Sequence, residues 1–102
     1  MLGGDDGSAR KLIRDALDDP DYRVRHAATV GAEKLGPEGA ALLAKRLRDE
    51  NGTVRCQAAA ALGRFGPAAM AHVPDIESAL KDEREARIQQ CLQRALSAIK
   101  RH

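Results

Sequence analysis

Apolar residues recur along the chain every three or four positions, which is the spacing that places side chains on one face of an α-helix. The clearest case runs from Thr53 to Gly66, where the apolar stripe consists mostly of alanine. Small side chains allow another helix to approach closely but cannot form a core alone, so we expect this helix to pack between neighbours. The pattern predicts helices over about Ala9–Asp18, Tyr22–Leu35, Glu38–Arg48, Thr53–Gly66, Pro74–Leu80 and Arg84–Lys100.

Polar residues, glycine and proline mark the ends of these helices. Ser8 and Asp21 stand where N-caps are expected, and the Gly-Pro pairs at 36–37 and 66–67 are typical helix stops. The first seven residues include three glycines and two acids, which predicts a flexible lead-in over 1–7 and one domain over 8–102.

The helices form a repeated unit. Val24-Arg25 recurs as Val54-Arg55 30 positions later, and Leu35-Gly36-Pro37 recurs as Phe65-Gly66-Pro67 at the same interval. The apolar stripe of the central helix returns 34 positions later in the final helix. A period of this length indicates stacked supersecondary units, and we place the repeats at about 8–36, 37–66 and 67–101.

The phrase Asp-x-x-x-x-Val-Arg, followed by an alanine-rich helix and Leu/Phe-Gly-Pro, resembles HEAT repeats, in particular the HEAT-like repeats of the bacterial, protist and phycobilin-lyase-related type. The resemblance covers about residues 9–100. It implies an all-α fold, a short right-handed α-solenoid of three antiparallel helix pairs whose second helices line the inner surface. It also implies that neighbouring repeats are joined by a ladder of hydrogen bonds from Asp19, Arg25, Asp49 and Arg55.

The third repeat departs from this pattern. Gln89 stands where the repeat arginine is expected, and Lys100 replaces the closing glycine. Terminal repeats of a solenoid commonly carry a polar outer face, so these changes are typical of a C-terminal cap.

The charge balance argues against a strong polyanion binder. Seventeen Lys and Arg stand against fifteen Asp and Glu, and the two signs are interspersed along most of the chain. The final helix is an exception, because it carries more arginine and lysine than acid, and this keeps nucleic acid or an acidic partner as an alternative. Nucleic-acid binding is disfavoured because no aromatic residues lie among these cations to stack on bases.

The two cysteines, Cys56 and Cys91, lie within predicted helices and without metal-ligand spacing. Free thiols in a reducing compartment are favoured over a disulfide. No segment is typical of a signal peptide or membrane span, so a soluble cytoplasmic protein is expected.

Catalytic chemistry is poorly represented in the chain. His26, His72 and His102 lack the spacing of helical metal ligands, and no serine has the Gly-x-Ser-x-Gly context. The His-Glu pairs of iron-binding HEAT hydroxylases are also missing. We expect no metal, no cofactor and no enzymatic activity; a lyase or lyase-subunit role has only the fold resemblance behind it.

The phase of the helices predicts a small, nearly uncharged inner surface that would admit a partner helix or peptide. The alternative is that its alanines are simply good helix formers. Association of two copies would also cover apolar side chains at the two ends of the stack. These are Leu12, Ile13 and Leu17 at one end and Leu92, Leu96 and Ile99 at the other. The predicted partner-binding residues are His26, Thr29, Val30, Glu33, Cys56, Ala59, Ala60, Gly63, Gln90 and Arg94.

Overall fold

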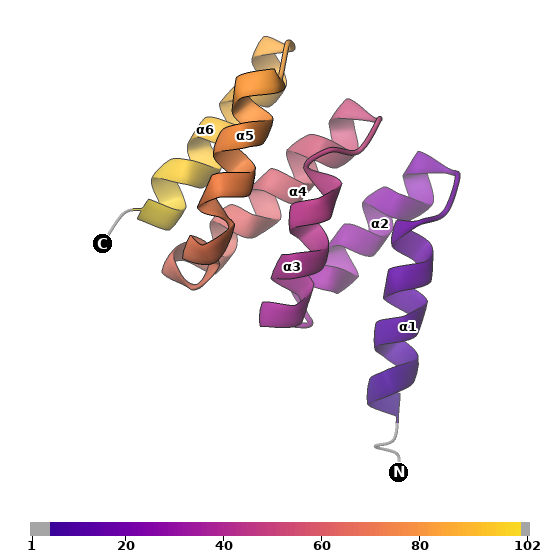
Figure 1. The fold of residues 1–102 in the computed structure, drawn as a ribbon. Coiled ribbons are helices and arrows are strands. Elements are labelled where there is room, and N and C mark those ends of the chain that lie inside the picture. The colour runs from indigo at the N-terminus through magenta and orange to yellow at the C-terminus, as the bar shows by residue number, and fades with distance from the viewer. Residues whose placement is uncertain (1–4, 101–102) are drawn as a thin grey trace.

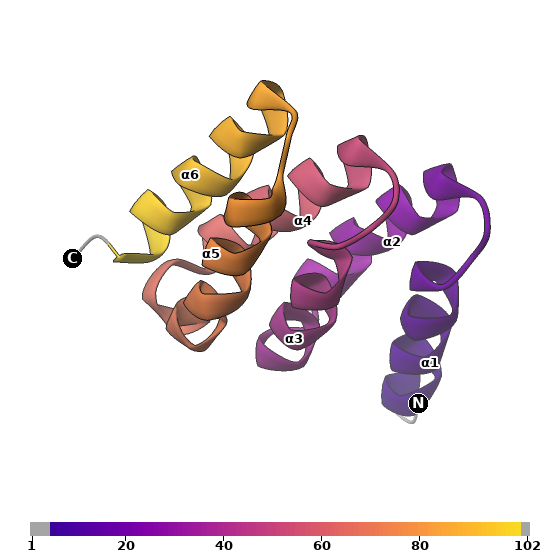
Figure 2. The ribbon, with the colours of Figure 1, turned by 45° about the horizontal axis from the view of Figure 1, so that its top comes forward.

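The helices lie in two layers in the computed structural model, which describes residues 5–100 (Figure 1). The first helix of each pair lies in one layer (α1, α3, α5) and the second helix in the other (α2, α4, α6), and a second view shows the same order (Figure 2). Every regular element of the described residues is a helix, as predicted. The elements are α1 (Asp5–Leu17), α2 (Tyr22–Glu33), α3 (Pro37–Arg46), α4 (Gly52–Phe65), the 3₁₀ helix η1 (Gly66–His72), α5 (Val73–Asp82) and α6 (Ala86–Lys100).

Helix α1 begins earlier than predicted. It starts at Asp5, so Ser8 lies inside the helix and the prediction that Ser8 caps it is wrong. Residues 5–7 of the expected flexible lead-in are therefore helical, while residues 1–4 lie outside the described part of the chain.

The N-cap predicted at Asp21 is confirmed, because its carboxylate accepts the backbone N–H of Arg23 at 2.8 Å. The corresponding residue before α4 is Asn51, whose side chain accepts the N–H groups of Thr53 and Val54. Gly36 and Gly66 follow α2 and α4 with φ of 74° and 61°. Such positive values favour glycine, so the chain turns at both Gly-Pro pairs. Helix α4 ends at Phe65, directly before Gly66, whereas α2 ends at Glu33, two residues before the predicted Leu35.

The core lies between the two layers. Of the stripe predicted for α4, Val54, Ala58, Ala61 and Leu62 are buried and Phe65 is partly buried, so the phase of this helix is correct. Its small side chains allow α4 to contact α2, α3 and α6. This helix is therefore the central packing element of the fold, as its alanine content predicts.

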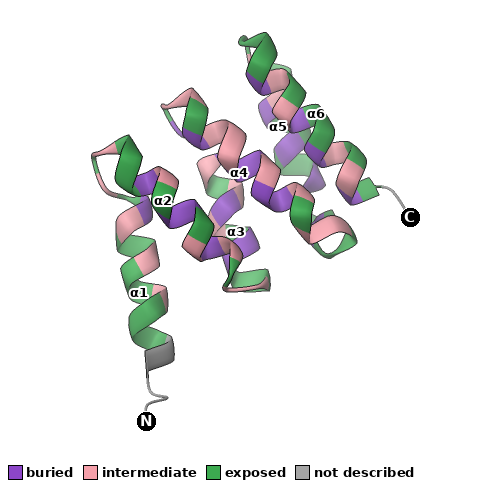
Figure 3. Ribbon diagram, turned by 180° about the vertical axis from the view of Figure 1, so that it is seen from behind, coloured by how far each residue is buried: buried purple, intermediate pink, exposed green. Residues whose placement is uncertain are grey.

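The two ends of the stack differ. At the N-terminal end Leu12 is 69% exposed and Val24 is 38% exposed. At the other end Leu92 and Ile99 are buried, so the predicted exposure there is wrong. The apolar stripe of α6 packs against α4 and α5, which leaves polar residues outside. Figure 3 shows the contrast, with α1 largely exposed.

Candidate functional site

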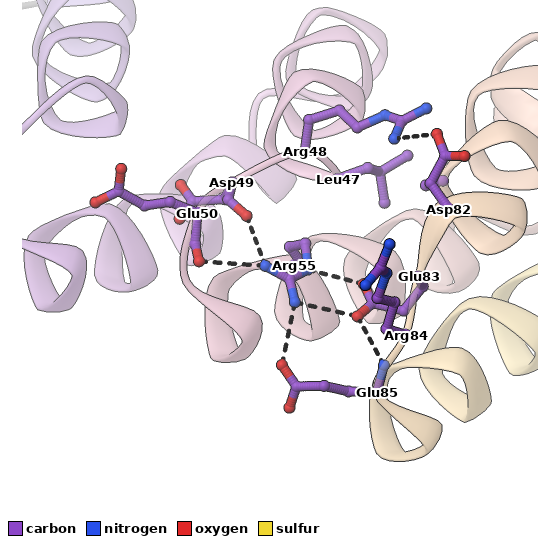
Figure 4. Close-up of a pocket in the computed structure, with 10 residues that line it drawn as sticks. Leu47, Arg48, Asp49, Glu50, Arg55, Asp82, Glu83, Arg84 and Glu85 are labelled. Carbon is purple, nitrogen blue, oxygen red and sulfur yellow. Dashed lines mark hydrogen bonds and ion pairs between the residues drawn. The ribbon is translucent and has the colours of Figure 1, made fainter.

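Each helix pair has a corner that joins its first helix to its second, and two hollows lie between the corners of neighbouring pairs. The first has a volume of about 390 Å³ and lies between the corner before α4 and the corner before α6 (Figure 4). The second, of about 570 Å³, lies between the corner before α2 and the corner before α4. Both are lined mainly by charged side chains, so their ion pairs decide what they can bind.

In the first hollow Arg55 is the central side chain (Figure 4). Its Nε and Nη2 donate to the two carboxylate oxygens of Glu83 at 2.8 and 3.1 Å, and Nη2 also lies 3.3 Å from Glu85. Its Nη1 donates to the backbone carbonyl of Asp49 at 2.9 Å. Arg55 thus joins α4 to both corners, and its acidic partner is Glu83, a residue that the repeat pattern did not single out.

The second hollow contains the equivalent pair, Arg25 and Asp49. Arg25 also donates through Nη1 to the backbone carbonyls of Asp19 and Pro20. Burial raises the pKa of Asp49, but the hydrogen bonds from Arg25 and from the Asn51 N–H outweigh it, so the pKa lies below its usual value. The carboxylate therefore stays ionised and paired at neutral pH.

Most charged side chains of the corner hollows are already paired within the protein, so few are available to bind a substrate. Across residues 7–100, whose side chains are described, every buried side-chain nitrogen and oxygen has a hydrogen-bond partner. In the same part of the chain no group of three His, Cys, Asp or Glu side chains is arranged to hold a metal ion. Arg25, Asp49, Arg55 and Glu83 are committed to joining helix pairs, whereas Asp19 and Arg84 form no ion pair with a described residue.

The other candidate is the second-helix face, the surface formed by α2, α4 and α6. Of the ten predicted partner-binding residues, Val30, Gln90 and Arg94 are exposed. Thr29 and Ala59 are fully buried, so their predicted exposure is wrong. The second helices pack closely enough to cover these side chains, and the Thr29 hydroxyl donates to the carbonyl of His26 at 2.6 Å. The remaining five are partly buried: His26, Glu33, Cys56, Ala60 and Gly63.

Close packing between second helices is clearest at Gly63. A Cβ atom at this position would lie 3.2 Å from the Cα of Ala95, so α6 covers the side of α4 that was predicted to be free. Arg64 Nε and Nη2 donate to the carboxylate of Glu33, both at 2.8 Å, and join α4 to α2. Gly63 and Glu33 thus hold neighbouring helices together.

Sequence reasoning missed Tyr22, which is an exposed aromatic residue on α2. It precedes His26 and Val30 by four and eight positions, a spacing that places all three on one side of the helix. The same spacing, read directly from the sequence, would have added Tyr22 to the predicted surface.

Cys56 and Cys91 form a disulfide between α4 and α6, with their Cα atoms 5.4 Å apart. The prediction of free thiols is therefore wrong. The sulfurs meet because Cys56 lies on the side of α4 that faces α6, and the sequence does not give the register between two helices. Disulfides persist mainly in oxidising compartments, so this bond lends no support to the cytoplasmic prediction.

None of the described helices combines the length and the apolar character needed to cross a membrane.

Comparison with known protein families identifies a repeat in the middle of the chain. Residues 41–69, which span the second half of α3, all of α4 and the start of η1, match the family described as HEAT repeat. No curated protein and no solved structure matches the chain.

Proposed function

This chain carries a HEAT repeat at residues 41–69, and from that premise we propose that it is a protein-interaction module. In this proposal three helix pairs form a right-handed solenoid, and the second-helix face binds a helix or an extended peptide of a partner protein. HEAT repeats commonly mediate such contacts, which is the family-level support for the proposal.

The observation that carries the proposal is a row of three residues across the second-helix face. Val30, Ala60 and Arg94 occupy equivalent positions on α2, α4 and α6, 30 and 34 residues apart. Val30 is 44% exposed, Ala60 is partly buried and Arg94 is exposed. The row therefore changes from apolar to small to basic across the molecule.

This gradient indicates the chemistry of the ligand. An apolar side chain of the partner would pack on Val30 and the nearby Tyr22, and its backbone would approach most closely over Ala60. An acidic residue at the other end would pair with Arg94. The ligand proposed is an amphipathic helix or peptide with an apolar half and an acidic half.

The test is affinity capture with matched variants. Ala60→Arg fills the centre of the row and Val30→Glu removes its apolar end, while Met70→Glu changes a similarly exposed apolar residue on η1. We expect a partner that is retained by the wild-type protein and by Met70→Glu but lost from the other two variants. Circular dichroism and thermal unfolding establish that each variant is folded.

Retention of the same partner by Ala60→Arg would overturn this binding site. Equal loss from Met70→Glu would also overturn it, because that residue lies outside the row. A partner recovered with all four proteins would indicate that the second-helix face is not used.

A second candidate function rests on exposed arginines of α6 and of the corner before it. Arg84, Arg87 and Arg94 are exposed and form no ion pair with any described residue, whereas Lys100 pairs with Glu77. These arginines would bind nucleic acid or an acidic protein surface. Retention on a heparin column that falls steeply with salt, and is lost when all three are changed to glutamine, would favour this function; no retention at low salt would exclude it.

The proposed module has no catalytic step. Arg25 pairs with Asp49 and Arg55 pairs with Glu83 in the corner hollows, and the row on the second-helix face contains no nucleophile or general base.

A further inference from the structure

The N-terminal end of the stack exposes positions that are covered in the later helix pairs. Val24 is 38% exposed, whereas its equivalents Val54 and Ile88 are both 0% exposed. Ile88 lies against the start of α4, because a Cβ atom added to Gly52 would meet its Cδ1. Residues at this position thus pack on the helix pair that comes before them, and Val24 has no such neighbour among the described residues.

The same comparison holds for Leu12 and Ala27. Leu12 is 69% exposed, while its equivalent Leu42 is partly buried and borders a small hollow beside Leu17. Ala27 is exposed, while its equivalent Cys91 is bonded to Cys56 of the preceding pair. Leu12, Val24 and Ala27 are therefore the exposed apolar positions of this end, and together with Asp19 we call them the N-terminal end face.

Asp19 occupies the position at which the two later corners carry an arginine-binding carboxylate. It is equivalent to Asp49 and Glu83, which bind Arg25 and Arg55 of the preceding helix pairs. All three carboxylates accept the N–H of the residue two positions ahead, at 2.8 Å for Asp19, 2.8 Å for Asp49 and 3.2 Å for Glu83.

Asp19 thus has the backbone support of the other two corners. Its carboxylate forms no ion pair within residues 7–100, where the side chains are described. Both equivalent carboxylates bind an arginine through two hydrogen bonds. An arginine guanidinium is therefore the group whose charge and shape fit the carboxylate of Asp19.

The opposite end of this chain does not supply that partner. Gln89 stands at the arginine position, and its Nε2 donates to the carbonyl of Glu83 at 2.7 Å. The outer side of α6 is polar, with Gln90, Gln93 and Arg94 lining a shallow hollow. A second copy stacked head to tail would place these polar groups on Leu12 and Val24, and it would present Gln89 instead of an arginine at the position that binds a corner carboxylate.

We propose that the N-terminal end face binds an α-helical hairpin of a partner protein, one that presents an arginine to Asp19 and an apolar stripe to Leu12 and Val24. This interface is separate from the second-helix face, since Val30 and Ala60 take no part in it. The hairpin would pack on α1 and α2 as these two helices pack on the following pair, where Arg25 of α2 binds Asp49 in the corner before α4.

The test uses a hairpin whose structure is known, the chain's own residues 37–66. A second copy of 37–66 is joined directly before Gly7, which preserves the 30-residue spacing. The copy carries Cys56→Ser, so that no third cysteine competes for the Cys56–Cys91 disulfide. We expect one cooperative unfolding transition whose midpoint lies about 5 °C or more above that of the 102-residue protein.

The arginine contact is tested by Asp19→Asn, which keeps the acceptor oxygen for the Asp21 N–H but removes the charge. We expect this change to lower the midpoint of the extended chain by about 5 °C, and that of the 102-residue chain by under about 2 °C. Arg55→Gln in the added copy should have the same effect, and the two changes together should cost little more than one.

Additive effects of the two changes, or separate unfolding of the added hairpin, would overturn the proposal. Light scattering of the 102-residue protein tests whether a second copy occupies the N-terminal end face. We expect a molar mass of 11.0 kDa across the concentration series. A mass of twice this value that returns to the single-chain mass in Leu12→Glu would also overturn it, because a second copy would then be the occupant.

Discussion

Arg25 binds Asp49, 24 residues further along the chain, with Nε and Nη2 lying 2.8 and 3.0 Å from the two carboxylate oxygens. The side chains are 7% and 2% exposed, so this is a buried, doubly hydrogen-bonded ion pair. Because Arg25 belongs to α2 and Asp49 to the corner before α4, the pair joins one helix pair to the next. The contact between Arg55 and Glu83 does the same one step further on.

Removing the charge of Asp49 should therefore be costly. We expect Asp49→Asn to lower the free energy of unfolding by about 3 kcal/mol, because it leaves the guanidinium of Arg25 buried without its counter-charge. Asp15→Asn is the matched control, since Asp15 pairs with Lys11 on the exposed side of α1, and it should cost under about 0.5 kcal/mol. Urea unfolding measures both, and equal effects would contradict a structural role for Asp49.

The same residues set the response to acid. The pKa values of Asp49 and Glu83 are lowered in the folded protein: burial raises each of them, and the hydrogen bonds from Arg25 and Arg55 outweigh that effect. The stabilisation is thus fully present above the unfolded-state pKa of about 4 and is lost as the pH falls through the lower folded-state value. We expect urea midpoints that are level from pH 7 to 5 and fall below pH 4. Asp49→Asn should reduce the slope below pH 4, and an unchanged slope would assign acid sensitivity to other groups.

The disulfide should contribute to stability by closing a long segment of chain. Cys56 and Cys91 are 35 residues apart, so loss of the bond is expected to cost about 3 to 4 kcal/mol through the entropy of the unfolded chain. Unfolding with and without reductant measures this, and the Cys56→Ser/Cys91→Ser double variant should be insensitive to reductant. Alkylation of two thiols in the folded, unreduced protein would show that the bond is not formed.

The packing of α4 is tested at Leu62, which is fully buried. Leu62→Ala should cost about 2 to 5 kcal/mol, because the removed side chain leaves a cavity between helices. Leu12→Ala offers the same chemical change at an exposed position and should cost under about 0.5 kcal/mol. A cost below about 1 kcal/mol at Leu62 would mean that α4 is rotated from the orientation described above.

The helices and the buried stripe of α4 could be predicted because they depend on local spacing. Val54, Ala58 and Leu62 are buried through the 3.6-residue period alone, whichever helix covers them. The cap at Asp21 and the stop at Gly66 are likewise local features.

The errors come from contacts between helices that are distant in the sequence. Thr29 and Ala59 are buried because α2, α4 and α6 pack more closely than the phase of one helix reveals. The Cys56–Cys91 bond depends on the register between α4 and α6. Glu83 could be found only when the third corner was seen beside Arg55, because the repeat pattern points to aspartate there. The candidate binding surface was thus predicted less well than the fold.

The disulfide also fixes the order in which the molecule can open. It ties α4 to α6, whereas α1 packs mainly against α2 and is largely exposed. Local unfolding of a helical array starts where a unit has the fewest neighbours. Amide hydrogens of α1 should therefore exchange fastest with solvent, followed by those of α2, while α4 and α6 exchange only through global unfolding. Unfolding that starts at α1 disrupts the N-terminal end, which carries Asp19, and leaves α4 and α6 joined by their disulfide.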